Sequence, residues 1–186
     1  GHTKYTQVDG IPALKEAVAE KFRRENGMDV SAANISVGTG GKQVLFNALM
    51  ATVQAGDEVI IPAPYWVSFA GITEVAGGPP VFLASGFDEG LKLTPERLEA
   101  AITARSRWVI INSPSNPTGM GYSPDEIRAF ADVIRRHPRL MVISDDLYEH
   151  LTFDGFTFST IAGTVPDLAD RVRTLNGVSE SNSMAR

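Results

Sequence analysis

The sequence predicts an α/β fold, a three-layer α/β/α arrangement with a mainly parallel sheet. Segments with helical periodicity alternate with short apolar segments along all 186 residues, which is the pattern of βαβ crossovers. The apolar segments are continuous runs with little polar alternation, so we expect helices on both faces of the sheet. The sequence has no internal repeat, low-complexity tract or linker, so we expect one domain over residues 1–186.

The first helix is expected to start at Pro12, because a proline at the first helical position has no N–H to leave unpaired. Leu14, Val18 and Phe22 repeat at four-residue spacing and predict its buried face. Gly27 is expected to end the helix as a left-handed cap.

The remaining elements follow in alternation. Thr94 is expected to cap a helix, and Ser123 with Glu126 forms a capping box at the start of another. The further helices are expected at residues 41–54, 65–76 and 123–136, and the strands at residues 59–61, 81–83, 109–111, 141–143 and 172–175.

Composition excludes several classes of function. The chain has no cysteine, which excludes disulfides, thiolate zinc sites and a cysteine nucleophile. Its net charge of -5 argues against a nucleic-acid-binding surface. No segment approaches the roughly 20 apolar residues of a membrane span, and the N-terminus lacks a signal-peptide core, so we expect a cytoplasmic protein. The histidines, His2, His137 and His150, show no metal-binding spacing, so no metal site is expected.

Ligands of open parallel sheets bind at the carboxyl ends of the strands, which directs attention to the loops there. Residues 38–43 (Gly-Thr-Gly-Gly-Lys-Gln) place glycines at a helix start, where free N–H groups and the helix dipole favour a phosphate. The spacing is not that of a Walker loop, and a glycine-rich helix entry without a ligand is the alternative. Trp66 offers a flat face to an aromatic ligand, but a core position is the better interpretation of this residue alone.

Two further loops carry polar groups. Asn116 lies in a proline-rich loop that follows a buried strand, where its amide is free to donate; a turn with good local chemistry is the alternative. Asp145 directly follows another strand, and a buried carboxylate there needs a cationic or N–H partner. Tyr148 lies three residues further on. The alternative is an N-capping aspartate with a core tyrosine.

Taken together and in this order, these segments resemble the fold-type-I pyridoxal-phosphate-dependent aminotransferases of class I/II, specifically the aspartate aminotransferase branch. The most specific matches are residues 116–119 (Asn-Pro-Thr-Gly) and 145–150 (Asp-Asp-Leu-Tyr-Glu-His), followed by residues 64–66 (Pro-Tyr-Trp). The resemblance covers residues 3–179. It implies an incomplete large, cofactor-binding domain, without the small domain of the family.

The resemblance implies four contacts to the ring of pyridoxal 5'-phosphate. Trp66 would stack on the ring, and Asn116 and Tyr148 would hydrogen-bond the ring hydroxyl oxygen. Asp145 would pair with the ring nitrogen and keep it protonated. Such a pair at about 4 Å is worth on the order of 4 kcal/mol at an effective dielectric constant near 20.

It also implies contacts around the phosphate. Gly40, Gly41 and Lys42 would bind it, mostly through backbone N–H groups, and Ser179 matches a further cofactor-binding position. Tyr5 resembles the residue that reaches the phosphate of a neighbouring subunit, which implies a homodimer. The unpaired edges of an incomplete sheet also favour self-association.

Glu180, Asn182 and Arg186 depart from the family pattern. Glu180 stands where the family has the lysine that forms the Schiff base and moves the proton. A general acid–base group contributes about 10²–10⁴-fold to the rate, so we expect little or no activity and weak, non-covalent cofactor binding. By lineage the reaction is amino-group transfer between an aspartate-like L-amino acid and a 2-oxo acid. A non-catalytic phosphate- or cofactor-binding fragment, or a pyridoxal-phosphate lyase, decarboxylase or cyclase, remains the alternative.

Overall fold

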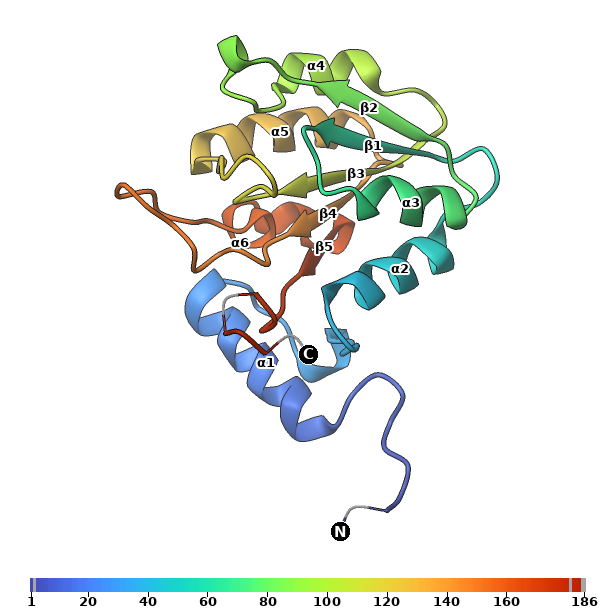
Figure 1. Cartoon of the computed structure of the whole chain (residues 1–186), viewed down its shortest axis with the longest axis vertical. Helices are drawn as coiled ribbons and strands as arrows, with labels where there is room; N and C mark the ends of the chain where they lie inside the picture. Colours follow the sequence, from blue (N-terminus) through green and yellow to red (C-terminus); the bar gives the residue numbers. More distant parts are fainter. Residues whose placement is uncertain (2, 181, 185–186) are drawn as a thin grey trace.

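The structure is a computed structural model that describes residues 1, 3–180 and 182–184. Helices and strands alternate along the chain, as predicted (Figure 1). The helices are α1 (Pro12–Asn26), α2 (Gly41–Thr52), α3 (Ser68–Val75), α4 (Pro95–Ala101), α5 (Pro124–Arg136) and α6 (Ile161–Thr164), the 3-10 turns are Ala32–Asn34, Phe87–Glu89 and Pro166–Arg171, and the strands are β1 (Glu58–Ala63), β2 (Pro80–Ala84), β3 (Ser106–Asn112), β4 (Met141–Asp145) and β5 (Val172–Leu175).

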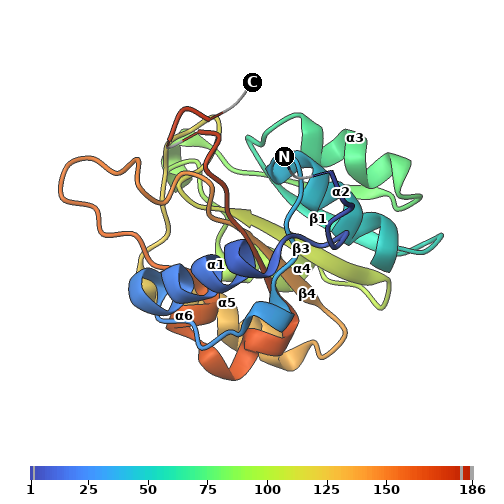
Figure 2. The ribbon, with the colours of Figure 1, turned by 90° about the horizontal axis from the view of Figure 1, so that it is seen from below.

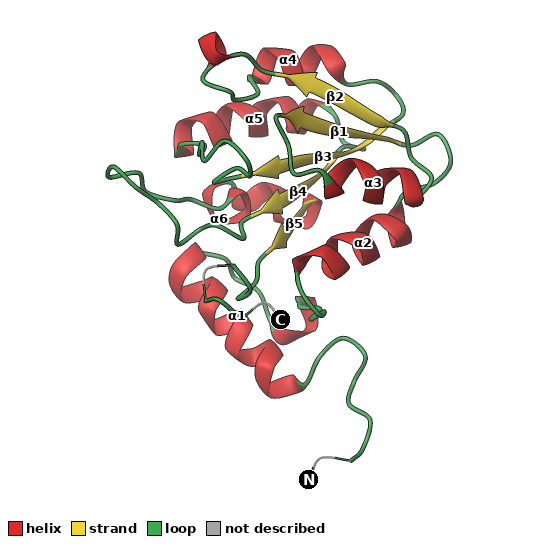
Figure 3. Cartoon of the chain, viewed as in Figure 1, coloured by secondary structure: helices red, strands yellow, loops and turns green. Residues whose placement is uncertain are grey.

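The five strands form one sheet in the order β2-β1-β3-β4-β5. Every neighbouring pair is parallel, which confirms the predicted fold class. The strands therefore end at one common edge, where green loops follow the arrowheads in Figure 3. This edge is where the sequence predicts the ligand site.

Helices cover both faces of the sheet, as the continuous apolar strands predict. On one face, Ile60 and Val109 belong to the core formed with α4, α5 and α6. On the other face, Ile61 and Ile110 belong to the core formed with α2 and α3. Figure 2 shows the two groups of helices on opposite sides of the strands.

The predicted buried face of α1 is wrong by part of a turn. Leu14 is 43% exposed, and the buried residues of α1 are Lys15, Ala19, Phe22 and Asn26. The apolar part of this face packs on a small cluster around Ile35, and polar contacts complete it. Gly27 ends the helix with φ 65°, so the predicted left-handed cap is confirmed.

The other helix starts show why some bounds were predicted well. Ser123 and Glu126 exchange the two hydrogen bonds of a capping box at α5, at 2.8 and 3.3 Å. In contrast, α3 begins at Ser68 rather than at residue 65, because Tyr65 turns aside to stack on Phe82 at 5.1 Å between ring centroids. Within the described residues, every helix is too short or too polar to span a lipid bilayer.

Candidate active site

The loops after β3, β4 and β5 lie side by side at the carboxyl edge of the sheet. Asn112 is in register with Asp145, and Asp145 is in register with Leu175. The Asn112 side chain fixes this edge, since its Nδ2 donates to the Asp145 carbonyl oxygen at 3.0 Å. Its Oδ1 accepts from the Asn116 N–H at 2.7 Å. The last residue of β3 therefore holds the following loop against β4.

The structure brings Asn116 and Tyr148 together, although 32 residues separate them in the sequence. The Asn116 Nδ2 atom donates to the Tyr148 hydroxyl oxygen at 3.4 Å. These are the two side chains that the family resemblance assigns to one ligand oxygen. Their convergence gives the site two neutral donors at one point of the sheet edge.

Asp145 is a buried residue of the predicted site, at 2% exposure. One carboxylate oxygen accepts the Leu147 N–H at 3.3 Å. No lysine, arginine or histidine among the described residues forms an ion pair with it. Burial raises the pKa of Asp145 to about 7, and the negative charge of Glu180 adds to this rise. A buried carboxyl group with this environment is suited to a cationic N–H ligand.

The glycine-rich helix start lies against the same loops. Gly40 has φ 99° and precedes the first residue of α2, where the backbone N–H groups of the first turn have no side-chain cap. A β-carbon at Gly41 would lie 2.8 Å from Leu147 Cδ1. One at Gly177 would lie 2.8 Å from Leu147 Cδ2. Leu147 therefore joins the α2 start to the loops after β4 and β5.

Trp66 and Lys42 are also brought together. The Lys42 Nζ atom lies 5.0 Å from the centroid of the Trp66 ring, within the range of a cation–π interaction. Trp66 is half-buried rather than a core residue, and it contacts Phe69 edge to face at 5.4 Å. The tryptophan is thus at the α2 start, with part of its ring surface accessible.

Three other sequence-predicted residues take different positions. The Ser179 hydroxyl donates to the neighbouring Glu180 carboxylate, and Glu180 is exposed near enough to Asp145 to influence its pKa. Tyr5 is fully exposed on the N-terminal segment, which extends away from the sheet (Figure 1). This single chain does not bring Tyr5 to the other site residues.

Glu149, which sequence reasoning missed, connects three segments. Its buried carboxylate accepts from the Lys21 ammonium, from Asn26 Nδ2 at 2.7 Å and from Asn176 Nδ2 at 2.9 Å. These partners come from α1 and from the loop after β5. The Asp-Asp-Leu-Tyr-Glu-His motif contains this residue, but no sequence pattern indicates partners so distant in the chain.

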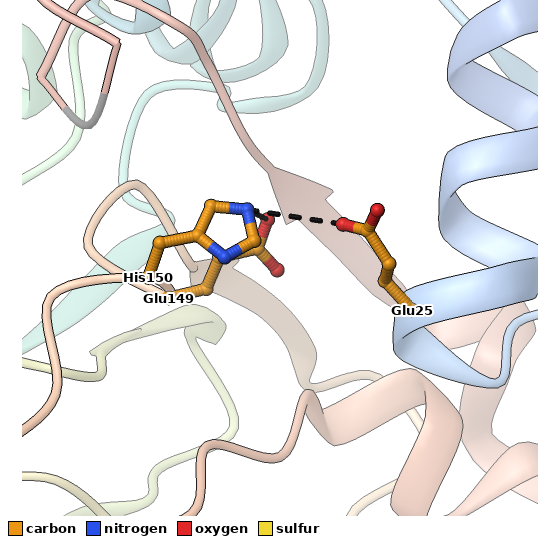
Figure 4. Close-up of side chains that lie close together, drawn as sticks. All are labelled: Glu25, Glu149 and His150. Atoms are coloured by element: carbon orange, nitrogen blue, oxygen red, sulfur yellow. Dashed lines mark ion pairs between the residues drawn. The ribbon is translucent and has the colours of Figure 1, made fainter.

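Glu149 also lies beside Glu25 and His150 (Figure 4). The three side chains offer ligand atoms within 4.8 Å of one another. The Lys21 ammonium already pairs with the same Glu149 oxygen that faces His150. The group is therefore an ion-pair network in this structure. His137 instead contacts Glu99 at 2.8 Å, and His2 lies outside the described residues.

Asp146 is a second buried acid that sequence reasoning missed. Its side chain is fully buried, and one oxygen accepts the Ser144 hydroxyl at 2.7 Å. The other oxygen has no hydrogen-bond partner among the described residues. Burial raises the pKa of Asp146 to about 8, with further contributions from the charges of Asp145 and Glu149. The burial of Asp146 therefore favours its neutral form.

The comparisons with known proteins agree with this fold. The family model for aminotransferase class I and II matches residues 1–186. The chain therefore belongs to the class I and II aminotransferase family. It is similar to the aspartate/prephenate aminotransferase of Cereibacter sphaeroides, with 58% identity over 99% of this chain and 46% of the relative.

Solved structures show the same fold. The crystal structure of the aspartate aminotransferase from Rhizobium meliloti matches with a TM-score of 0.97 and 51% identity, over 100% of this chain and 46% of that one. A mutant of the Thermus thermophilus aspartate aminotransferase matches with a TM-score of 0.92 and 41% identity, over 98% and 47%. The chain spans about half the length of the curated relatives it matches.

Proposed function

We propose that residues 1–186 belong to the large, cofactor-binding domain of an aspartate-type aminotransferase. The activity of the complete protein would be amino-group transfer between an aspartate-like L-amino acid and a 2-oxo acid. Two relatives support this, one named aspartate/prephenate aminotransferase with 58% identity and one named aspartate aminotransferase with 51% identity.

The cofactor would be pyridoxal 5'-phosphate. The observation that carries this part of the proposal is Asp145, a buried carboxyl group without a cationic partner among the described residues, next to the converging Asn116 and Tyr148 side chains. When bound, the cofactor supplies an electron sink for the substrate α-carbon. Asp145 would hold a proton on the ring nitrogen, and Asn116 and Tyr148 would orient the ring through its hydroxyl oxygen.

The remaining contacts would fix the ring plane and the phosphate. Trp66 would supply the stacking surface, and this requires the Lys42 ammonium to leave the part of the ring that it now faces. Gly40 and Gly41 would bind the phosphate through the uncapped N–H groups at the α2 start, aided by Lys42 and Ser179. The uncapped α2 start and the proximity of Lys42 to Trp66 support these roles.

Glu180 limits what this chain does with the cofactor. A carboxylate provides no amine for covalent attachment, and its charge lies beside that of Asp145. We therefore propose weak, non-covalent binding and little or no amino-group transfer by this chain. Tyr5, exposed on the N-terminal segment, would reach the phosphate site of a second copy in a homodimer.

A titration with pyridoxal 5'-phosphate tests the proposal, followed by borohydride treatment and mass spectrometry. We expect saturable binding that leaves no borohydride-stable adduct on the chain. The variant Glu180→Lys is expected to gain such an adduct at position 180. Failure of both proteins to bind would overturn the cofactor site, and a stable adduct on another lysine of the original chain would overturn non-covalent binding.

Light scattering over a concentration series tests the assembly. We expect a dimer or a larger self-associated species, and replacement of Tyr5 by alanine should weaken cofactor binding without loss of the fold. A protein that is monomeric at all concentrations contradicts the proposed homodimer but leaves the cofactor proposal intact.

A further inference from the structure

Two Asn-Gly steps of the chain converge on one carboxylate. Asn26 Nδ2 donates to Glu149 Oε2 at 2.7 Å, and Asn176 Nδ2 donates to Glu149 Oε1 at 2.9 Å. Asparagine followed by glycine is chemically labile, since glycine has no side chain to shield its backbone nitrogen from the asparagine amide. The fold places the same dipeptide in two different geometries, which allows a direct comparison of their reactivity.

At the second dipeptide, Asn176-Gly177, the reacting groups face each other. The Gly177 backbone N–H donates to its neighbour's side-chain oxygen, Asn176 Oδ1, at 2.7 Å. Because a carbonyl bond is about 1.23 Å long, the Gly177 nitrogen lies within about 4 Å of the side-chain carbon Cγ. A productive approach requires about 3–3.5 Å, so a small rotation of the side chain suffices. Both residues are partly exposed, which gives water access to the step.

The first dipeptide, Asn26-Gly27, has a geometry that does not favour the reaction. Asn26 is buried at the end of α1, and its Oδ1 accepts from Lys21 Nζ at 2.7 Å while its Nδ2 donates to Glu149. The Gly27 N–H is committed to the Phe22 carbonyl oxygen in the helix cap. The Gly27 nitrogen, which would be the nucleophile, is therefore engaged in the helix cap.

We propose that Asn176 is a site of spontaneous deamidation in the folded protein, whereas Asn26 is protected by its helix cap and its buried contacts. In the reaction, the Gly177 nitrogen forms a bond to Asn176 Cγ. The bond from Cγ to the side-chain nitrogen breaks, and ammonia leaves with the proton that the Gly177 nitrogen gives up. Water then opens the cyclic imide at either carbonyl, which yields an aspartyl or an isoaspartyl linkage.

The modification changes the Glu149 network. Either product replaces an amide donor with a second carboxylate beside the buried Glu149, and Lys21 is the cation already paired there. Like charges at this distance repel in a partly buried site. The loop that leads to Ser179 and Glu180 thereby loses its hydrogen bond to the loop after β4, next to the candidate active site.

Peptide mapping by mass spectrometry tests the proposal on the intact chain. The folded protein and the same protein in denaturing urea are incubated in a mildly alkaline buffer, and the peptides with Asn176 and Asn26 are followed over time. In the folded protein, we expect Asn176 to convert about tenfold faster or more, a barrier difference of about 1.4 kcal/mol. In urea, the two Asn-Gly steps are expected to convert at similar rates.

Asn176→Gln serves as the matched control, since it keeps an amide donor but cannot form the five-membered imide. It should abolish conversion at residue 176 and leave the rate at Asn26 unchanged. Equal rates at the two steps of the folded protein, faster conversion of Asn26, or an intact Asn176 that reacts only in urea would each overturn the proposal.

Discussion

Leu147 packs so closely on Gly41 that a β-carbon at residue 41 would lie 2.8 Å from its Cδ1 atom. This contact joins the first turn of α2 to the loop that carries Asp145 and Tyr148. Packing against Leu147 therefore favours a glycine at residue 41, in addition to any contact with a phosphate. The relationship couples the position of the helix start to the position of the candidate active site.

Gly41→Ala is expected to destabilise the fold, because the added methyl group displaces Leu147. Overpacking of this kind costs typically about 1–3 kcal/mol, measured as the free energy of unfolding in urea. Gly71→Ala is the matched control in α3, where nothing lies within 4 Å of the new β-carbon. It should stabilise the protein by roughly 0.5–1 kcal/mol. Equal stability changes at the two positions would contradict the packing account.

Lys21→Met is expected to destabilise the fold strongly. The substitution removes the ammonium group from the buried Glu149 carboxylate, which keeps the amide donors Asn26 and Asn176 and a contact with His150 at 3.3 Å. Removing one partner of a buried pair costs roughly 3 kcal/mol or more, again measured by urea unfolding. Arg128→Met removes the cation of an exposed pair with Asp125 and should change little. If Lys21→Met changed the free energy of unfolding as little as Arg128→Met does, the Glu149 network would add no stability.

Asp146→Asn is expected to change how stability depends on pH. The folded-state pKa of Asp146 is raised to about 8 by burial, from an unfolded value near 3.9. The folded state therefore binds this proton more tightly, and the stability it contributes is lost as the pH rises from about 4 to 8. The asparagine does not titrate, so the variant should gain stability relative to the original chain as the pH rises from about 4 to 8, the range between the two pKa values. Parallel stability curves for the two proteins across this range would refute the expectation.

Asp145→Asn should have opposite effects on stability and on cofactor affinity. Burial raises the pKa of Asp145 to about 7, so its removal stabilises the unliganded fold at alkaline pH. The same change removes the charge that would hold the cofactor ring nitrogen, and we expect the affinity for pyridoxal 5'-phosphate to fall by about tenfold or more, that is 1.4 kcal/mol. Fluorescence titration and urea unfolding measure the two effects. Unchanged affinity would remove Asp145 from the site, and Asp125→Asn, an exposed carboxylate on α5, serves as the control.

Local chemistry predicted much of the fold. The strand over residues 172–175 has the predicted bounds, and the capping box of α5 forms as expected, because both depend on adjacent residues. The buried face of α1 was misjudged because Lys15 and Asn26 are buried by polar partners outside the helix. The spacing of apolar residues within one helix carries no information about such partners.

The residues of the candidate site likewise fall into those that the sequence predicts and those that it does not. Asn116 and Tyr148 could be proposed from their places after predicted strands, and the parallel register explains why they meet. Glu149 and Asp146 could not be proposed from the sequence. Glu149 is bound by Lys21 and Asn26 of a distant helix, and both acids are buried by other elements of the fold. Buried polar networks of this kind are defined only once the tertiary structure exists.

The strand order has a consequence for how the protein is made. After β2 has paired on one side of β1, the strands β3, β4 and β5 are added on the other side in the order of their synthesis. A chain emerging from the ribosome can thus extend the sheet one strand at a time, each new strand finding a completed neighbour. Asp145 ends β4 and Tyr148 follows it, so these two side chains reach the sheet edge only after β1, β2 and β3 have been made.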